Sequence, residues 1–314
     1  MKYRLALYLF TIMLIVSCGP GRSVPGNNGR SALRANTEWP YVLFDGDFPD
    51  PSILVDGKDY YMTFTSQRAV PGLPIYHSTD MVHWEQIGNA LNREVGQVWA
   101  PDLQKINGKY YIYFPASFQL YVVYADSMEG PWSEPIDLGV RAIDPGYASD
   151  GNGKQILYAN NGRSVPLAPD GLSVEGQLKH AYDAWPIPKD WVIECRCLES
   201  PKIFKRGEWF YLVSAEGGTS GPATSHMAVV HRSSSVEGPW ELSPYNPLVH
   251  TYSADEPWWS KGHGTIFQDH FGDWWIVYHA YRNGRHDLGR HTLIEPITWT
   301  KDGWPVIGGI KKNP

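Results

Sequence analysis

Three acidic residues occur at matching places along the chain and could carry acid–base chemistry. Asp50, Asp144 and Glu199 each lie seven to nine residues before a glycine that opens an aromatic-rich segment, and each is followed by proline, directly or after one serine. Carboxyl groups that converge on one site suit glycoside hydrolysis, where one acid protonates the leaving oxygen and another activates water or attacks the sugar. A third carboxylate nearby would raise the pKa of the donor by like-charge repulsion. Glu199 is the candidate proton donor.

A plainer interpretation is that these acids only begin turns. Asp before Pro is common at turns, and Glu-Ser-Pro can act in the same way. For any single acid the two interpretations are equally good. Three acids at equivalent positions favour a shared site, provided that the surrounding elements bring the positions together.

A repeated segment supplies those elements. A glycine turn followed by a short strand rich in aromatic and β-branched residues recurs five times, with spacings of 51, 45, 54 and 65 residues. The copies are GKDYYMTFTS from 57, GKYYIYFPAS from 108, GKQILYANN from 153, GEWFYLVSAEGG from 207 and GDWWIVYHAY from 272. A period of this size predicts an all-β fold, a five-bladed β-propeller with one sheet per copy. Propellers bind ligands where the axis opens, so residues just upstream of each repeat are expected to meet there.

A second repeat supports the same fold. Residues 74–88, 121–135 and 228–242 each give a strand, a polar turn and a Trp that opens the next strand. Because three repeats use the residue alike, we interpret Trp84, Trp132 and Trp240 as structural wedges between strands.

Composition and charge limit the classes of ligand. The chain has 314 residues, of which 42% are hydrophobic and 19% charged, which excludes disorder. Its formal net charge is −6, with no basic patch, which argues against nucleic acid and polyanions. The expected partner is a neutral oligosaccharide or polysaccharide. The repeats leave room for one domain, expected to be a monomer.

The N-terminus predicts export. Lys2 and Arg4 precede an apolar run over residues 5–16, which is too short to span a bilayer as a mature helix, and then Ser17-Cys18. This pattern resembles a bacterial lipobox, so we expect a signal peptide over residues 1–17, lipidation of Cys18, and anchoring at a bacterial membrane in the periplasm or at the cell surface. An ordinary secretory signal is the alternative. We expect residues 18–38 to be a flexible tether and residues 39–314 to be the catalytic propeller.

Two further cysteines lie close together in sequence. Cys195 and Cys197 would face the same side of a strand, and a bond between them would need strained geometry. We therefore expect free thiols. Two cysteines alone do not make a zinc site.

Several motifs together resemble glycoside hydrolase family 43, from about Phe44 to Ile307. The motifs are DPSI at 50–53, PIYHSTDMVHWEQIGNAL at 74–91, VWAPDL at 98–103, IDPG at 143–146, LESPKI at 198–203, SAEGGT at 214–219, GHGTIF at 262–267 and LGRHTL at 288–293. The family's members are inverting enzymes on a five-bladed propeller that act on arabinose- and xylose-containing glycans.

The resemblance implies a role for each acid. Asp50 would be the general base, Asp144 the residue that modulates the pKa and orients the acid, and Glu199 the general acid. The sequence departs from the family pattern in two places: Ser200 stands where Gly often follows the acid, and Gly146 where Ser often follows Asp-Pro. Neither departure removes a carboxylate.

The same resemblance implies four substrate-binding residues. Trp99 would offer an indole face to a sugar, Asp102 a polar neighbour, His263 a position near the central cavity, and Arg290 a contact to the innermost sugar. In many members the histidine faces calcium or another cation through water, so a calcium ion at the axis is possible, although calcium prefers oxygen ligands. Packing of Trp99 beneath the site, a turn role for His263 and a surface ion pair for Arg290 are the alternatives.

Two polar residues near these motifs are expected to belong to a polar loop. They are Glu216 in SAEGGT and His226 shortly after it.

The motifs favour an exo-acting enzyme of the xylosidase and arabinofuranosidase branch. Many xylosidases of that branch carry an additional C-terminal β-sandwich, which this sequence does not show, and this favours an α-L-arabinofuranosidase. A β-xylosidase and an exo-β-galactanase-like glycosidase are alternatives. From other classes, a non-catalytic glycan-binding propeller and a protein-interaction propeller remain, but neither has a reason to keep three buried acids, which cost stability when unpaired.

Overall fold

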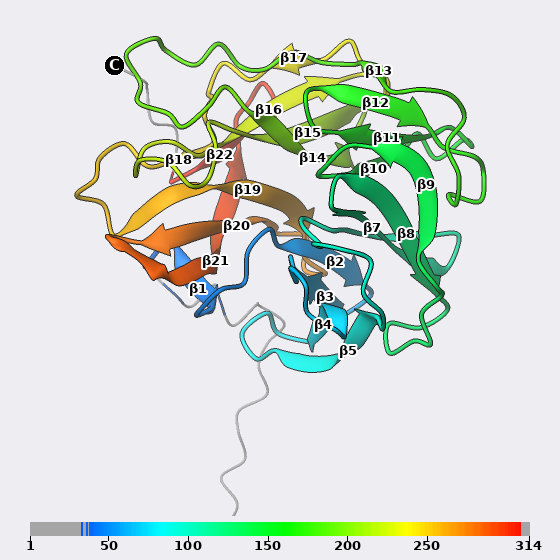
Figure 1. Ribbon diagram of the computed structural model, residues 1–314. Helices are drawn as coiled ribbons and strands as arrows, with labels where there is room; N and C mark the ends of the chain where they lie inside the picture. The colour runs from blue at the N-terminus through cyan, green and yellow to red at the C-terminus, as the bar shows by residue number, and fades with distance from the viewer. Residues whose placement is uncertain (1–32, 34–35, 37, 309–314) are drawn as a thin grey trace, which may run out of the picture. The chain divides into compact units, whose positions relative to one another are not determined.

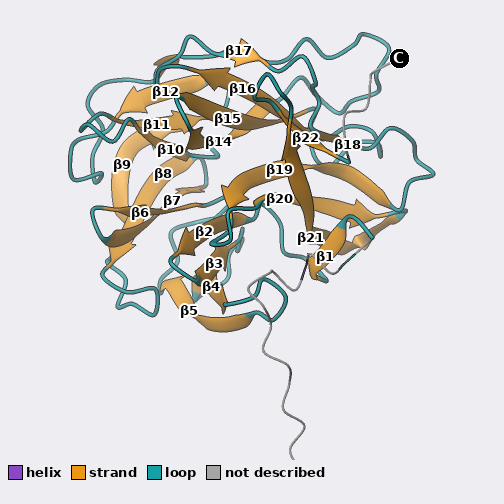
Figure 2. Cartoon of the chain, turned by 180° about the vertical axis from the view of Figure 1, so that it is seen from behind, coloured by secondary structure: helices purple, strands orange, loops and turns teal. Residues whose placement is uncertain are grey.

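The computed structural model describes residues 38–308 together with Leu33 and Asn36. The predicted signal peptide, Cys18 and most of the predicted tether lie outside the described residues. The described part is built from β-strands and contains no α-helix (Figure 2). Accordingly, no helix in it is long and apolar enough to span a membrane.

The predicted five-bladed β-propeller is confirmed, because the strands form five separate antiparallel sheets (Figure 1). Blade 1 consists of β2 (Ser52–Asp56), β3 (Asp59–Thr63), β4 (Gly72–Ser78) and β5 (Glu85–Leu91). Blade 2 consists of β6 (Asp102–Ile106), β7 (Lys109–Ala116), β8 (Gln119–Ala125) and β9 (Ile136–Arg141). Blade 3 consists of β10 (Gly146–Ser149), β11 (Gln155–Ala159), β12 (Arg163–Pro166) and β13 (Lys179–His180). Blade 4 consists of β14 (Leu198–Arg206), β15 (Trp209–Glu216), β16 (Met227–Ser233) and β17 (Glu241–Leu242), and β18 (Val249–His250) also pairs with β16. Blade 5 consists of β19 (Trp258–Gln268), β20 (Trp274–Arg282), β21 (Arg285–Trp299) and β1 (Tyr41–Phe44), and β22 (Pro305–Ile307) also pairs with β21.

The blades close into a ring. The first strand of each blade contacts the first strands of its two neighbours, in the order β2, β6, β10, β14, β19 and back to β2. The ring is also closed through the sequence, because β1, from the start of the described chain, pairs with β21 near its end. In that pairing Tyr41 lies opposite Ile294. The C-terminal strands β21 and β22 complete the last blade.

The five repeat glycines occupy the turn between the first and second strand of each blade. All have positive φ: 63° at Gly57, 84° at Gly108, 104° at Gly153, 60° at Gly207 and 90° at Gly272. Glycine adopts this left-handed region without the steric cost that a Cβ brings, which explains why the residue recurs. Because strands alternate in direction, all five turns lie at one end of the first strands. The acids that precede those strands lie at the other end.

The hydrophobic core lies between neighbouring blades rather than within one layer. Five clusters of buried residues each join strands of two adjacent blades; one of them, for example, combines Leu73 and Ile75 of blade 1 with Leu103 and Ile112 of blade 2. This arrangement explains the aromatic-rich second strands. Their side chains are buried on both faces of the sheet, as the pattern of β7 and β15 shows.

The three repeated tryptophans hold the turn before a fourth strand. The indole N–H groups of Trp84 and Trp132 donate to the carbonyl oxygens of Met81 and Met128, at 3.1 Å and 3.3 Å. These two residues close their own hairpins, in line with the structural interpretation. Trp240 instead donates to the hydroxyl of Tyr158 in the neighbouring blade, at 3.2 Å.

Candidate active site

The fold brings the three acids together at one opening of the axis. Asp50 precedes β2, Asp144 precedes β10, and Glu199 is the second residue of β14, so each lies where the first strand of its blade begins. All three line one cavity of about 200 Å³. Its lining is formed by Asp50, Gln67, Gln97, Trp99, Ile143, Asp144, Glu199, Thr219, His263 and Arg290. The convergence that the repeat predicted is therefore observed.

The backbone is strained where it delivers these acids. Asp50 has φ of 59°, Asp144 has φ of 54°, and Ser200, directly after Glu199, has φ of 54°. Residues other than glycine rarely adopt this left-handed region, and such strain clusters at functional sites. In each case it turns the chain just before or at the start of a first strand, so that the acid faces the cavity.

Asp50 lies among groups that favour its charged form. Its Oδ1 atom is 3.1 Å from Nη1 of Arg290, and its Oδ2 atom accepts a hydrogen bond from the hydroxyl of Thr65 at 2.5 Å. Nδ1 of His279 lies 3.1 Å from Oδ1, and Nδ1 of His263 lies 3.4 Å from it. Burial alone would raise the pKa of Asp50, but Arg290 and the two histidines outweigh it and hold that pKa well below the usual range. Asp50 is thus a carboxylate at neutral pH, as a general base must be.

Three histidines stack beneath Asp50, and they are neutral. The rings of His226 and His279 are 5.2 Å apart, and those of His263 and His279 are 5.6 Å apart. Burial is the main cause that lowers the pKa of all three, to about 3 for His263. Nε2 of His279 lies 2.9 Å from the hydroxyl of Thr219, which lines the cavity. The histidines therefore position Asp50 and Thr219 and do not supply protons near neutral pH.

The surroundings of Glu199 favour its protonated form. Burial, and then the negative charges of Asp50 and Glu194, raise its pKa to about 7, against a smaller opposing effect of Arg290. Burial and the charge of Glu199 also raise the pKa of Asp144 well above its usual range, although Lys202 and the Ser200 N–H oppose the shift. The surroundings therefore favour the protonated form of both acids. A proton is thus available on this wall of the cavity at neutral pH, which a general acid requires.

Asp102 has a supporting position instead of the direct sugar contact that we expected. It is buried, does not belong to the cavity lining, and its Oδ1 atom pairs with Nζ of Lys202 at 2.9 Å. Nζ of Lys202 also donates to the carbonyl oxygens of Pro101 at 2.7 Å and Pro145 at 3.3 Å. The second oxygen of Asp102 accepts the backbone N–H of Tyr147 at 2.8 Å. Lys202 and Asp102 therefore tie blades 2, 3 and 4 together beneath the acids.

Of the other predicted residues, Trp99, His263 and Arg290 line the cavity. Arg290 pairs with Asp50 rather than with a surface acid, so the surface alternative does not hold for it. The sequence reasoning missed Gln67, Gln97 and Thr219. Thr219 is the last residue of the SAEGGT motif and Gln97 directly precedes VWAPDL, so the motifs marked both segments but not these residues as part of the site.

Glu216 does not lie in a polar loop, contrary to expectation, whereas His226 lies in the loop between β15 and β16 but is buried. Glu216 is the last residue of β15 and is buried, with burial as the main cause that raises its pKa to about 7. His226 is also buried, and neither of its ring nitrogens has a hydrogen-bond partner among the described residues. Glu216 accepts the backbone N–H of Trp185 at 3.0 Å, and the ring of His226 stacks on that of His279, which contacts Asp50.

The two departures from the family pattern lie against each other. A Cβ atom on Gly146 would lie 1.6 Å from the carbonyl oxygen of Pro201, the residue after Ser200. No other residue fits at position 146 without moving this backbone. The glycine in blade 3 thus accommodates the Ser-Pro backbone in blade 4.

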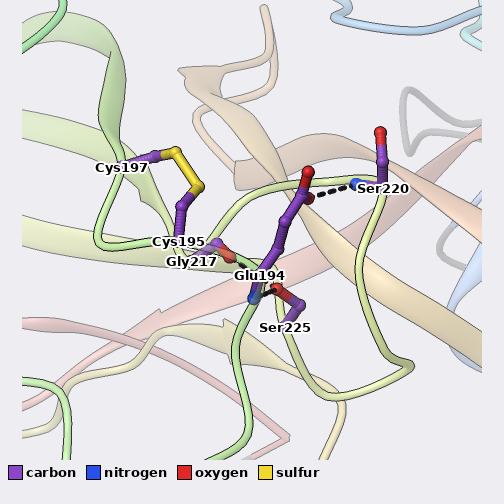
Figure 3. The surroundings of a disulfide bond; sticks show 6 residues. All are labelled: Glu194, Cys195, Cys197, Gly217, Ser220 and Ser225. Carbon is purple, nitrogen blue, oxygen red and sulfur yellow. Dashed lines mark hydrogen bonds between the residues drawn. A yellow bond between two sulfur atoms is a disulfide. The ribbon is translucent and has the colours of Figure 1, made fainter.

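Cys195 and Cys197 form a disulfide, so the expectation of free thiols is wrong (Figure 3). The expectation assumed a strand, but both residues lie in the loop before β14, where their Cα atoms are 5.2 Å apart, within the usual range. The loop is tied to the turn after β15: the N–H of Glu194 donates to Oγ of Ser225 at 2.7 Å, and the carboxylate of Glu194 accepts the N–H of Ser220 at 2.7 Å. Ser220 follows Thr219, so the disulfide loop braces a segment of the cavity wall.

The side chains near His263 give little support to the predicted calcium ion at the axis. One atom each of Asp50, His263 and His279 lie within 4.8 Å of one another, which gives two imidazole nitrogens and a carboxylate already paired with Arg290. Calcium takes six to eight oxygen ligands, and this set does not fit it. Nε2 of His263 is buried and without a partner among the described residues, so it could contact a water molecule. A calcium ion at the axis stays a prediction.

Two larger cavities lie elsewhere on the described part of the chain. One, of about 320 Å³, is lined by residues that include Tyr252 and Glu256, and the other, of about 570 Å³, by residues that include Trp274 and Trp299. The Glu256 carboxylate is paired with Lys261 at 2.7 Å. Neither cavity brings three carboxyl groups together, as the smaller one does, so size does not identify the site.

Comparison with known proteins places the chain among glycosidases. Residues 41–305 match the family described as glycosyl hydrolases family 43. The chain is 34% identical to a non-reducing end alpha-L-arabinofuranosidase of Bacteroides ovatus over 85% of its own length and 53% of the relative's. It is 31% identical to a beta-xylosidase of Bacillus subtilis over 86% of its own length and 57% of the relative's. The solved structure of a family 43 protein, BlXynB of Bacillus licheniformis, superposes with a TM-score of 0.77 at 30% identity, covering 86% of this chain and 57% of that one.

The chain therefore spans about half the length of the curated relatives that it matches. The family match covers most of the chain, and the structure has the propeller of the solved relative. The chain belongs to glycosyl hydrolases family 43.

Proposed function

We propose that this protein is an inverting glycoside hydrolase that removes single sugar units from the end of a neutral glycan. One observation carries the proposal. Two acids that face the same cavity have opposite protonation preferences, with the pKa of Asp50 well below its usual range and the pKa of Glu199 raised to about 7. Pairs of titratable groups whose surroundings separate their pKa values identify the acid and the base.

In this proposal each acid carries one step of the reaction. Glu199, protonated, gives its proton to the glycosidic oxygen as the bond to the leaving group breaks. Asp50, ionised, takes a proton from a water molecule that attacks the anomeric carbon from the opposite face, so the configuration inverts. Asp144 modulates the pKa of Glu199 and orients it. Arg290 and Thr65 fix the orientation of the Asp50 carboxylate.

The size of the cavity supports action at chain ends. Its volume of about 200 Å³ is below the roughly 300–1,000 Å³ of sites that enclose drug-sized ligands. A cavity of this size accommodates about one sugar ring. The next unit of the glycan must then lie at the cavity mouth.

The released sugar is an arabinofuranosyl or xylosyl unit, and α-L-arabinofuranosidase activity is the first choice. The names of the relatives support both sugars, since the Bacteroides ovatus relative is an arabinofuranosidase and the Bacillus subtilis relative a beta-xylosidase. A β-xylosidase is therefore the second candidate. The exo-β-galactanase-like alternative has no support from these names.

The test is an activity assay with aryl α-L-arabinofuranoside, β-xyloside and β-galactoside, in which NMR follows the anomer of the first product. We expect turnover of the arabinofuranoside and a product with inverted configuration. Turnover of the xyloside alone would select the second candidate. Binding of these glycans without any turnover would establish instead a non-catalytic glycan-binding propeller.

We also propose that the protein is exported and anchored through a lipid on Cys18. The support is the sequence of residues 1–18 alone, with its basic start, short apolar run and Ser-Cys end. Mass spectrometry of the N-terminus after expression of the full chain in a bacterium tests this proposal. An acylated Cys18 is expected, and an intact Met1 or cleavage at another residue would contradict it.

A further inference from the structure

An exposed aromatic ring lies in a strained turn beside the cavity. Phe118 is 54% exposed, and it forms the two-residue turn between β7 and β8 together with Ser117. Both residues have positive φ, 49° for Ser117 and 71° for Phe118. Two-residue hairpins with this backbone favour Asn-Gly, and a bulky residue there is an outlier. The backbone strain costs stability, and about half of the side-chain surface stays in contact with solvent.

The topology places this turn at the cavity mouth. First strands begin at the cavity and strands alternate in direction, so the turn between the second and third strand of every blade returns to that same end. In blade 1 this turn supplies Gln67, and in blade 4 it supplies Thr219, both of which line the cavity. Phe118 holds the corresponding place in blade 2.

Contacts on both sides fix Phe118 against the cavity wall. Its ring centroid is 4.9 Å from that of Trp99, with the ring planes at 76°. Its carbonyl oxygen accepts the N–H of Ala142 at 3.0 Å, next to Ile143 in the lining. The N–H of the preceding Ser117 donates to the carbonyl of Gln97 at 3.0 Å. The turn is therefore attached to Gln97 and Trp99 of the cavity wall and to Ala142, the neighbour of Ile143.

We propose that Phe118 is a binding platform for the second sugar of the substrate, the unit next to the one enclosed with the acids. This inference rests on the proposed glycosidase function. The face of an aromatic ring is negative and attracts the C–H groups of a sugar ring, which carry slight positive charge. A neutral pyranose or furanose ring suits this site, because the phenyl ring of Phe118 offers apolar area and no ionic partner. An aromatic platform at the cavity mouth would strengthen the binding of oligosaccharides relative to simple glycosides. It would not contact the reacting atoms.

The experiment compares ligands of one and two sugar units in the wild type and in Phe118→Ala, Phe118→Tyr and a control. Phe271→Ala is the matched control, because Phe271 is also exposed, at 42%, but lies in the turn between β19 and β20 at the opposite end of the first strands. For each protein, KM and kcat are measured with a disaccharide or longer substrate. The dissociation constant of the single released sugar is measured by calorimetry.

We expect Phe118→Ala to raise KM for the oligosaccharide by about 5- to 10-fold, the size of one aromatic contact. Its affinity for the single sugar should stay within about two-fold of the wild type, and Phe118→Tyr and Phe271→Ala should behave as the wild type. Equal losses for both ligands would overturn the inference, because the ring would then only support Trp99. Unchanged values for Phe118→Ala would overturn it as well.

The outcome separates this inference from the proposed function. An active enzyme with no effect at Phe118 removes the platform and leaves the glycosidase function intact. If the wild type cleaves no glycoside, the proposed function fails, and calorimetry with the disaccharide still decides whether Phe118 contacts a second sugar.

Discussion

The two walls of the cavity place the same functional group in opposite surroundings. On one wall, Asp50 faces a guanidinium, a hydroxyl and neutral imidazoles. On the other wall, Glu199 faces other carboxyl groups, and none of the described residues donates a hydrogen bond to its side chain. The first arrangement stabilises a carboxylate and the second stabilises a carboxylic acid.

This difference shows that the protonation state of each acid is set by the neighbouring groups and not by the acid itself. The neighbours of Asp50 come from blades 1 and 5, whereas the coupled acids Asp144 and Glu199 come from blades 3 and 4. The propeller thus separates a base wall, defined here as Asp50 with Arg290 and Thr65, from an acid wall, defined as Asp144, Glu199 and the buried Lys202. Substitutions in the base wall should therefore affect the protein differently from substitutions in the acid wall.

Removing the acids themselves should have the largest effect. Asp50→Asn and Glu199→Gln should each lower kcat/KM on a natural oligosaccharide by roughly 100- to 10,000-fold, the usual contribution of general acid–base catalysis. The two variants should differ on a glycoside with dinitrophenolate as leaving group, because this group leaves without a proton. Glu199→Gln should recover much of its activity there, and Asp50→Asn should not.

Circular dichroism and thermal unfolding provide the control for these variants, since both should keep the fold. Equal recovery of the two variants on the activated substrate would contradict the assignment of acid and base.

Removing Lys202, the cation of the acid wall, should mainly lower the stability of the protein. Lys202→Met leaves the carboxylate of Asp102 buried without its ion-pair partner, and breaking such a pair costs about 3–5 kcal/mol of the free energy of unfolding. The measurement is urea unfolding followed by tryptophan fluorescence.

Lys105→Met is the matched control, because Lys105 pairs with Asp56 at 2.6 Å but both side chains are partly exposed. Exposed pairs contribute about 0–1 kcal/mol, so this variant should be close to the wild type. Equal losses in the two variants would show that Lys202 does not hold the acid wall together.

The fold was predictable because it rests on repetition. Five glycines with one backbone requirement, and aromatic strands at a regular spacing, mark the turns and cores of five blades before any contact is known. The convergence of Asp50, Asp144 and Glu199 followed from the same repetition, since equivalent positions in a ring lie at one end of its axis.

The contacts between blades could not be predicted from the sequence in the same way. Lys202 and Asp102 are about a hundred residues apart, and no local pattern marks two buried residues of this kind as partners. The disulfide was missed because the reasoning placed Cys195 and Cys197 on a strand, whereas β14 begins only at Leu198. Thr219 and His279 meet across two blades, so only the folded chain shows that they support Asp50.

The smallest expected effect concerns the backbone of the acid wall. Ser200 has φ of 54° and a buried hydroxyl without a partner among the described residues. Ser200→Gly removes both costs and keeps the backbone N–H that contacts Asp144, so it should raise the free energy of unfolding by about 1 kcal/mol and leave kcat within about two-fold. Thermal unfolding measures the gain.

Ser214→Gly is the matched control. Ser214 is equally buried but lies on β15 without a positive φ, so glycine should destabilise the protein there. A loss of stability in Ser200→Gly would show that the serine itself supports the acid wall.

The pH dependence of kcat/KM on an oligosaccharide tests the contrast between the walls most directly, because it reports the acid and the base of the free enzyme. Activity should fall above an apparent pKa of about 7 as Glu199 loses its proton. On the acid side, activity should persist below the ordinary carboxyl range, because the pKa of Asp50 is lowered. Glu199→Gln on the activated glycoside should lose the alkaline fall. An enzyme that stays fully active beyond pH ~9, or that already loses its base near pH ~6, would contradict the two-wall account.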